Sequence, residues 1–302
     1  MIFSLGSLLF SQLRYTFPMS KELDKVATLA EVRTILDSLY PPELAEDWDR
    51  VGLICGDPAA PVRRILLALD PVQETVSEAL TGQYDLLFTH HPLYLRGTSF
   101  VPVDDPKGKL IHQLISGGCA LFNAHTNADV AQFGVAQALA EAVGLNDSEP
   151  LISSGNDTHP GLGRVGKLPQ PIPFREFAQR VANALPAGPQ GLLAGGELDA
   201  QVQTIAVSGG AGDSLLADAR AAGADVFLTA DLRHHPASEH LEGGRPFLLC
   251  GSHWATEVVW CELAQKALQE RFQECGFNIE VVVSKAVTEP WVLWLPTGEG
   301  EQ

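Results

Sequence analysis

The sequence predicts an α/β protein made of two related α/β halves. Two observations predict this fold class: a strand–helix–strand pattern occurs twice, and each copy is followed by another apolar run and a helix. The chain has 302 residues, enough for one large or two ordinary domains. Hydrophobic residues make up 45% and charged residues 19%, which is typical of a folded globular protein.

The two copies of this pattern align without a gap at an offset of 140 residues, between 65–91 and 205–231. Each begins with an apolar run, continues through an Asp or Gly turn and an amphipathic helix, and ends in a short buried strand, DLLFT or DVFLT. This is a βαβ unit, which implies parallel strands and a right-handed crossover. The match favours an internal duplication; the alternative is that common βαβ patterning produces a chance similarity.

Domain boundaries follow from this repeat. We expect residues 19–150 to form the first half, 151–200 to join the halves, and 201–302 to form the second half. Residues 1–18 include the apolar stretch MIFSLGSLLF, but lack a basic region and a cleavage site of small residues. We therefore expect them to be a disordered extension, or a misplaced start before Met19.

Charge and cysteine content restrict the class of protein. The formal net charge of −17 disfavours binding to phosphate backbones, and its simplest role is solubility. No segment is long and apolar enough to span a bilayer, so no membrane partner is expected. Five cysteines, an odd number without a C-x-x-C pair, indicate reduced thiols in a cytoplasmic protein.

Candidate metal ligands follow three predicted strands. His90 and His91 end the first βαβ unit, and Pro92 biases the chain away from a helix there. Two adjacent imidazoles at a strand end can turn toward two neighbouring ions, although an ordinary solvated pair has the same sequence. Because ligands in open α/β sheets bind beyond the carboxyl ends of strands, we expect these groups to share one crevice.

A histidine precedes a carboxylate by four residues after each repeat. His253 and Glu257 would share one face of a helix, where Glu257 can bridge two cations; the alternative is an exposed helical contact. Asp129 is the counterpart of Glu257, and His125 is a candidate catalytic acid or base, or a group that orients a ligand. The alternative is a loop with an Asx turn. Together these residues predict a dinuclear metal site in the crevice between the halves.

Two further segments are polar or rich in glycine. In the segment 229–240, Asp231 and His235 are predicted to line the pocket or to support the ligands, because the repeat places Ala230 and Asp231 where the first half has His90 and His91. The segment 208–214, SGGAGDS, is either an anion-binding turn or, as we favour, a tight turn between strand and helix. No P-loop, G-x-S-x-G or H-E-x-x-H motif is present.

The mixed imidazole and carboxylate set fits two divalent metal ions. Zn or Fe is the preferred metal, and Ni or Mn is the alternative.

Five ordered motifs then identify a resemblance, which covers about residues 27–290. They are EDWDRVGLICGDP, DLLFTHHPLYLRG, NAHTNADVAQFGVAQALAEAVGL, TADLRHHPASEH and GSHWATEVVWCELAQKAL. The chain resembles the dinuclear-metal-centre hexameric proteins known as GTP cyclohydrolase 1 type 2 homologues.

The resemblance implies a fold of two halves and a toroidal homohexamer with metal sites facing an internal cavity. It also implies the ligand set His90, His91, Asp129, His253 and Glu257. Some members of the family carry an inserted middle domain, and the short joint predicted here indicates that this chain lacks one. The resemblance does not establish a reaction.

Three hypotheses of function follow. The first is a metal-dependent hydrolase acting on a small nucleotide-like or heterocyclic substrate, with water activated by the metals and His125 as acid or base. The second is a metal-handling or regulatory scaffold without turnover. The third is a protein-interaction platform in which the metals are structural.

Overall fold

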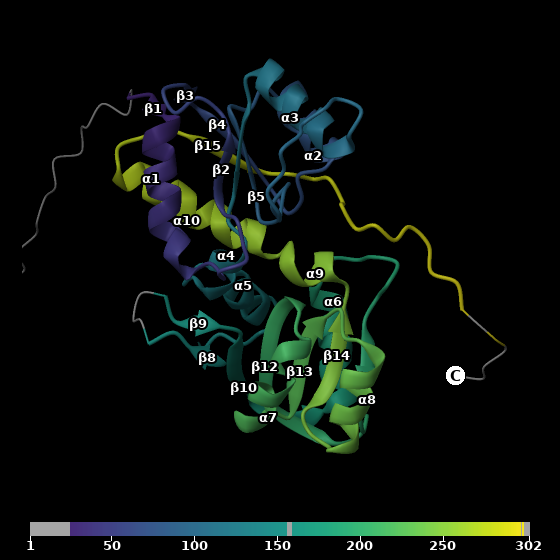
Figure 1. The fold of residues 1–302 in the computed structure, drawn as a ribbon. Helices are drawn as coiled ribbons and strands as arrows, with labels where there is room; N and C mark the ends of the chain where they lie inside the picture. The colour runs from purple at the N-terminus through teal and green to yellow at the C-terminus, as the bar shows by residue number, and fades with distance from the viewer. Residues whose placement is uncertain (1–24, 156–158, 297, 299–302) are drawn as a thin grey trace, which may run out of the picture.

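Two β-sheets, each with its own helices, form two lobes with a long helix crossing between them (Figure 1). The computed structural model describes residues 25–155, 159–296 and 298. The predicted extension at residues 1–18 lies outside the described residues. The described residues form a mixed α/β fold, as the sequence predicted.

The first sheet has the strand order β15-β4-β5-β6-β2, parallel except for β2 at one edge. Its hydrophobic runs become buried strands because helices cover both faces. Its elements are β2 (Gly52–Cys55), β4 (Arg64–Ala68), α2 (Gln73–Thr81), β5 (Leu86–Thr89), α3 (Pro106–Gly117), β6 (Ala120–Asn123) and β15 (Glu280–Val283).

The second sheet has the order β11-β14-β13-β12-β10-β7, with a parallel centre and antiparallel strands on both sides. Its elements are β7 (Ser148–Glu149), β10 (Arg164–Pro173), α6 (Phe174–Ala184), β11 (Leu193–Gly195), β12 (Gln201–Ala211), α7 (Leu216–Ala221), β13 (Val226–Ala230), α8 (His234–Glu242) and β14 (Phe247–Gly251).

The remaining elements connect or cover the sheets. They are β1 (Ala27–Thr28), α1 (Leu29–Leu39), the 3₁₀ turn η1 (Pro42–Leu44), β3 (Pro61–Val62), α4 (Thr126–Val130), α5 (Val135–Ala142), β8 (Ile152–Ser153), β9 (Gly161–Leu162), the 3₁₀ turn η2 (Asp213–Leu215), α9 (His253–Glu257) and α10 (Trp260–Glu274). None of the helices in the described part of the chain is long and apolar enough to cross a membrane. All five cysteines are free.

The two βαβ units have the same register at the offset read from the sequence. Ile65 pairs with Leu86 in the first sheet, and the residues 140 positions later pair in the second, Ile205 with Val226. Each unit also has an aspartate before its second strand. Asp85 accepts hydrogen bonds from the backbone at 63 and 64, and Asp225 accepts them at 203 and 204. The predicted parallel strand–helix–strand units are therefore present.

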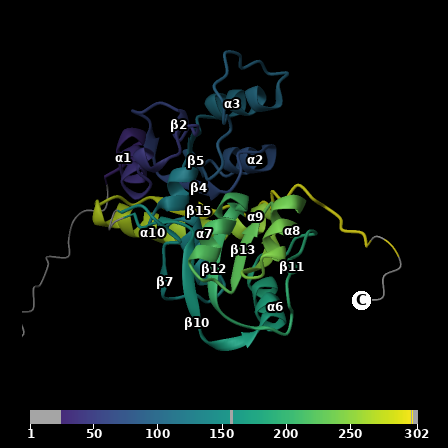
Figure 2. The ribbon, with the colours of Figure 1, turned by 60° about the horizontal axis from the view of Figure 1, so that its bottom comes forward.

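The sheets divide the chain differently from the predicted boundaries. The segment 151–200, expected only to join the halves, supplies β10 and β11 to the second sheet. The last strand, β15, lies within the predicted second half of the chain but pairs in parallel with β4 of the first sheet. The chain therefore crosses from the second sheet back to the first through α10, which lies between them (Figures 1 and 2).

One short helix joins the cores of the two lobes. Val135 and Ala138 of α5 pack in the core beneath the first sheet, together with Trp260 of α10. Leu139 of the same helix packs in the core of the second sheet. Because α5 belongs to both cores, the region where the sheets meet is held firmly, and the candidate site lies there.

Candidate metal centre

Three strand ends supply the candidate ligands, as the sequence indicated. His90 and His91 follow β5, and His125 and Asp129 follow β6, with Asp129 on α4. The third pair, on α9 after β14, comes from the other sheet: the helix begins at His253, and the Ser252 hydroxyl caps it by accepting from the Ala255 amide. The helical spacing places His253 and Glu257 on one face, and Glu257 is buried.

Glu257 faces two groups of ligands, one with each carboxylate oxygen. Its Oε1 lies 3.8 Å from His90 Nε2, which is itself 3.8 Å from Asp129 Oδ1. Its Oε2 lies 3.0 Å from His91 Nε2 and 3.1 Å from His253 Nε2. The carboxylate therefore lies between two clusters of nitrogen and oxygen donors, as a bridging ligand must.

An oxygen lies within hydrogen-bond distance of Nδ1 in each of the four imidazoles, and the Nε2 atoms of His90, His91 and His253 face Glu257. His91 Nδ1 lies 2.6 Å from Asp70 Oδ1, and His253 Nδ1 lies 2.7 Å from Asp231 Oδ2. Partners of this kind fix the orientation of metal-ligating histidines and raise their basicity. The other two contacts are His90 Nδ1 to the Ala124 carbonyl at 2.9 Å and His125 Nδ1 to Asp49 Oδ2 at 3.0 Å.

The donor set fits a metal ion. His90 is fully buried, and its Nε2 has no hydrogen-bond partner among the described residues. Glu257 Oε2 is also buried without one, although two imidazoles lie within ion-pair distance of it. Buried polar atoms are rarely left unpaired, because each costs about 1–3 kcal/mol. Two groups of three residues have donor atoms within 4.8 Å of one another: His90, His91 and His125, and His91, His253 and Glu257.

The metal-free cluster has strongly shifted pKa values. Burial lowers the pKa of His90 to about 3, with the opposing charge of Glu257 unable to offset it. Burial would also lower the pKa of His91 and His253, but the carboxylates that face them raise it to about 10 and about 9. Burial and the charge of Glu257 raise the pKa of Asp129 well above its usual range. The same cluster can therefore hold protons or cations.

Glycines of β12 allow the Glu257 side chain to lie this close to the backbone. A Cβ at Gly210 would lie 2.2 Å from Glu257 Oε1, and one at Gly209 would lie 3.2 Å from Glu257 Cγ. The Gly210 amide also donates to the Thr256 hydroxyl at 3.1 Å. The glycine-rich segment therefore ends a strand against the candidate site, and α7 begins only after the turn that follows.

In the structure, His125 lies close to the candidate ligands His90 and His91. The sequence predicted it as a catalytic acid or base, and that role stays a prediction. Its ring lies 5.2 Å from that of His90 and 5.6 Å from that of His91, and its position suits a ligand equally well.

The two supporting residues predicted from the sequence lie in different places. Asp231 supports a candidate ligand, because its Oδ2 is within hydrogen-bond distance of His253 Nδ1. His235 is exposed at the first turn of α8, with its ring edge-to-face with that of His234, and no hydrogen bond or ion pair joins it to the described ligands. Asp49 and Asp70 were missed, although each holds a ligand imidazole. The only signal for them was that Asp49 belongs to the EDWDRVG motif and that Asp70 ends an apolar run.

Replacing Asp231 by asparagine should weaken metal binding by about 10–100-fold, as losses of such supporting carboxylates do. Asp231 has a positive φ of 52°, which asparagine tolerates, so the backbone should be retained. Competition with a chelator would measure the affinity. Asp199→Asn is the control, since Asp199 is exposed and, among the described residues, forms an ion pair with exposed Arg175 alone. Equal affinities of the two variants would contradict the role of Asp231.

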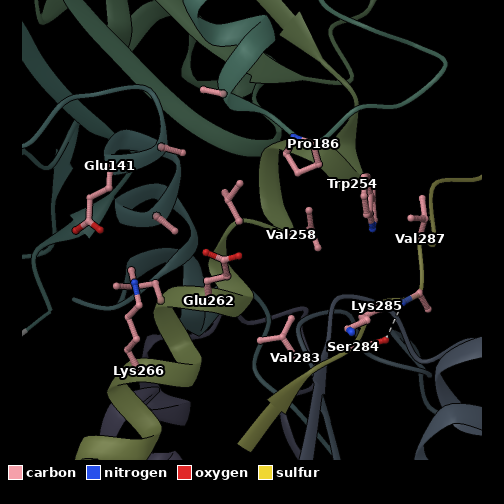
Figure 3. Close-up of a pocket in the computed structure, with 16 residues that line it drawn as sticks. Glu141, Pro186, Trp254, Val258, Glu262, Lys266, Val283, Ser284, Lys285 and Val287 are labelled. Carbon is pink, nitrogen blue, oxygen red and sulfur yellow. Dashed lines mark hydrogen bonds between the residues drawn. The ribbon is translucent and has the colours of Figure 1, made fainter.

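Two cavities share Trp254 of α9, and of these two only one is lined by candidate ligands. The larger, of about 510 Å³, is lined by Trp254, Val258, Glu262 and Lys266 among others, and none of the candidate ligands lines it (Figure 3). The smaller, of about 300 Å³, is lined by His91 and His253. Its position makes the smaller cavity the candidate substrate pocket.

The fold and site define an α/β protein with a candidate metal centre of imidazoles and carboxylates where its two sheets meet. The chain belongs to the Duf34/NIF3 (NGG1p interacting factor 3) family, whose model matches residues 27–290.

Curated relatives share the name GTP cyclohydrolase 1 type 2 homolog. A GTP cyclohydrolase 1 type 2 homolog of Streptomyces coelicolor is 52% identical over 265 residues, covering 87% of this chain and 93% of the relative. A GTP cyclohydrolase 1 type 2 homolog of Mycobacterium tuberculosis is 34% identical, covering 90% and 99%. That alignment spans 379 residues, more than the whole of this chain, so the relative contains residues that this chain lacks.

Solved structures of relatives have the same fold. A Bacillus cereus protein related to NIF3 matches with a TM-score of 0.81 and 25% identity, covering 89% of this chain and 99% of that one. A hypothetical protein of Staphylococcus aureus also has a TM-score of 0.81, with 28% identity and coverage of 88% and 99%.

Proposed function

We propose that the chain binds two divalent metal ions, Zn or Fe first among them, and hydrolyses a small nucleotide-like or heterocyclic substrate. The observation that carries this proposal is the position of Glu257, with one oxygen toward His90 and the other toward His91 and His253. A carboxylate between two donor clusters offsets the mutual repulsion of two cations.

Each side chain has a distinct task in this proposal. His90 and Asp129 would hold one ion, His91 and His253 the other, and Glu257 both. The ions would supply Lewis acidity that activates water at neutral pH. Asp49 contacts Nδ1 of His125, whose ring lies beside those of His90 and His91, and in this proposal His125 takes up or delivers a proton. The name of these relatives favours a heterocyclic substrate, since it refers to a cyclohydrolase.

Elemental analysis of freshly purified protein tests the metal part of the proposal. We expect two metal ions per chain, and a loss of at least one in Glu257→Gln. Glu262→Gln is a matched control, because Glu262 lies five residues further along and lines the other cavity. Wild-type protein without stoichiometric metal would overturn the proposal.

A metabolite screen tests the reaction. Metal-loaded protein should release a hydrolysis product from a nucleotide-like or heterocyclic compound, and His125→Ala should slow that turnover. If His125→Ala instead loses metal in parallel with activity, His125 is a ligand rather than an acid or base. No turnover over a broad panel would refute the hydrolase.

The second candidate function is metal handling or regulation without turnover. One observation favours it: the His253 side chain is 37% exposed and Asp231 is 50% exposed, so an ion held by His253 can exchange with solvent. Rapid exchange of the bound ion with isotopically labelled metal, together with an inactive screen, would support this function over hydrolysis. The interaction-platform hypothesis instead requires ligand variants to lose assembly.

We also propose that the chain acts in the cytoplasm as a toroidal homohexamer and that its two halves arose by duplication. The equal register of the two βαβ units supports the duplication. Five large apolar side chains at 291–295 are 60% to 90% exposed, and such a patch favours assembly. Light scattering should give a hexamer for the full chain and a smaller species after removal of residues 292–302.

A further inference from the structure

An exposed apolar run follows the last residue that lines the smaller cavity, Trp291. It consists of residues 292–295, VLWL, whose exposed fractions range from 60% at Trp294 to 90% at Val292. Figures 1 and 2 both show the end of the chain after β15 running away from the two lobes. A run of exposed apolar residues is unfavourable in water, so this one indicates a surface that it binds.

The residues that follow this run are acidic. We call residues 292–302 the tail: its apolar part is followed by Glu299 and Glu301, and it contains no lysine or arginine. The match to the family model ends at residue 290, so the tail lies outside the matched part of the chain. A surface that binds the tail should therefore be apolar and carry positive charge.

The first lobe has a groove with both properties. The groove has a volume of about 590 Å³ and lies where α2 and α3 begin. Its apolar lining residues are Pro71, Val72, Leu93, Val103, Pro106 and Leu110. Lys107 and Lys109 line it too, with Asp104 as the one acidic group among its described lining residues, although the whole chain has a net charge of −17. No described residue of the tail lines this groove.

We propose that the tail of one copy of this chain binds the groove of a second copy, with residues 292–295 in the groove and Glu299 and Glu301 beside Lys107 and Lys109. The tail and the groove are complementary in polarity and in charge. A contact between two different surfaces of one chain builds a ring when successive rotations close. This inference rests on the proposed function, since it identifies a contact that joins neighbouring copies in the proposed assembly.

Two double variants of the full metal-loaded chain test the two sides of this contact. The tail variant is Val292→Glu with Leu293→Glu, because neighbouring side chains of an extended segment face opposite sides. The groove variant is Lys107→Glu with Lys109→Glu. All four positions are exposed, so both variants should fold. Light scattering over a range of concentrations should show at least tenfold weaker assembly in each, whereas Lys167→Glu, at an exposed position of β10, should assemble like the wild type.

Mixing and charge exchange show whether the contact joins different copies. The tail variant keeps an intact groove and the groove variant keeps an intact tail, so the two should assemble more tightly when mixed than either does alone. A tail and a groove that meet within one chain would give no such gain. Adding Glu299→Lys and Glu301→Lys to the groove variant should restore its assembly, because the charges are then exchanged between the two sides.

Three outcomes would overturn the inference: wild-type assembly in either double variant, no gain on mixing, or a monomeric wild type, even one whose tail binds phosphatidylcholine vesicles. Metal content is measured in the same samples. A metal-loaded hexamer that is unchanged in the tail variant would overturn this inference and leave the proposed function standing. Assembly that needs the tail and the groove in protein without metal would support this inference and overturn the proposed function.

Discussion

Gly210→Ala should lower metal affinity by about 100-fold, the upper end of what changes around a metal ligand produce. The added Cβ would lie 2.2 Å from Glu257 Oε1 and 3.3 Å from His253 Cε1. Glu257 is buried, so its carboxylate cannot move aside into solvent. The oxygen that faces His90 would be displaced, and the two donor clusters would lose their common ligand.

Backbone strain must be separated from this local effect. Gly210 has a φ of +64°, where an alanine costs about 1–2 kcal/mol of stability. Gly223 has a φ of +70° with nothing within 4 Å of a Cβ, so Gly223→Ala carries the same strain far from the ligands. Chemical denaturation should show similar losses of unfolding free energy for the two metal-free variants, while chelator competition should show weak metal binding only in Gly210→Ala. Wild-type affinity in Gly210→Ala would show that Glu257 does not need its observed position.

The ligands could be predicted from the sequence because each follows a strong local signal. The apolar run before His90 ends in a strand, and the spacing of His253 and Glu257 is that of one helical turn. Parallel strands place their carboxyl ends at one edge, which brings together the residues that follow β5 and β6. His253 and Glu257 follow β14 of the other sheet, so their approach depends on how the two sheets meet.

The supporting residues and part of the topology could not be predicted in this way. Asp49 and His125 are 76 positions apart, and no periodicity relates them. The strand β10 contains three prolines within its span, a composition that argues against a strand, and its pairing with β12 shifts register between Lys167 and Ile172. The return of β15 to the first sheet depends on the direction in which the chain leaves α10, and the repeat itself does not predict that direction.

Metal affinity should rise by about 100-fold per pH unit near neutrality, because two protons must leave the site when metal binds. In the metal-free protein, the pKa values of His91 and His253 are raised to about 10 and about 9, so both rings are protonated at pH 7. A ligating imidazole is neutral, so each ring releases its proton on metal binding. His90, with a pKa lowered to about 3, is already neutral and releases none.

Calorimetric titration of zinc into metal-free protein, in buffers of different ionisation enthalpy, measures this release directly. We expect at least two protons per loaded chain at pH 7, from His91 and His253, and Asp129, whose pKa is also raised, adds its own where it is still protonated. Asp70→Asn removes a carboxylate that raises the pKa of His91, so the release should fall by up to one proton. Asp199→Asn, remote from the site, should match the wild type. Release of no protons would mean that the imidazoles are neutral before the metal arrives.

The stability of the metal-free protein should depend on pH in the opposite sense. A histidine whose pKa is raised by folding stabilises the fold fully below its unfolded pKa of 6.5, and this contribution is lost as the pH rises through the folded value. The metal-free chain should therefore lose stability between about pH 7 and pH 10, where its affinity for metal increases. Denaturant unfolding at both pH values, with and without zinc, would measure this.

The same carboxylates that attract protons to His91 and His253 attract the cations, so the metal replaces the charge that the protons supplied. Stability that rises with pH in the metal-free chain would contradict this exchange.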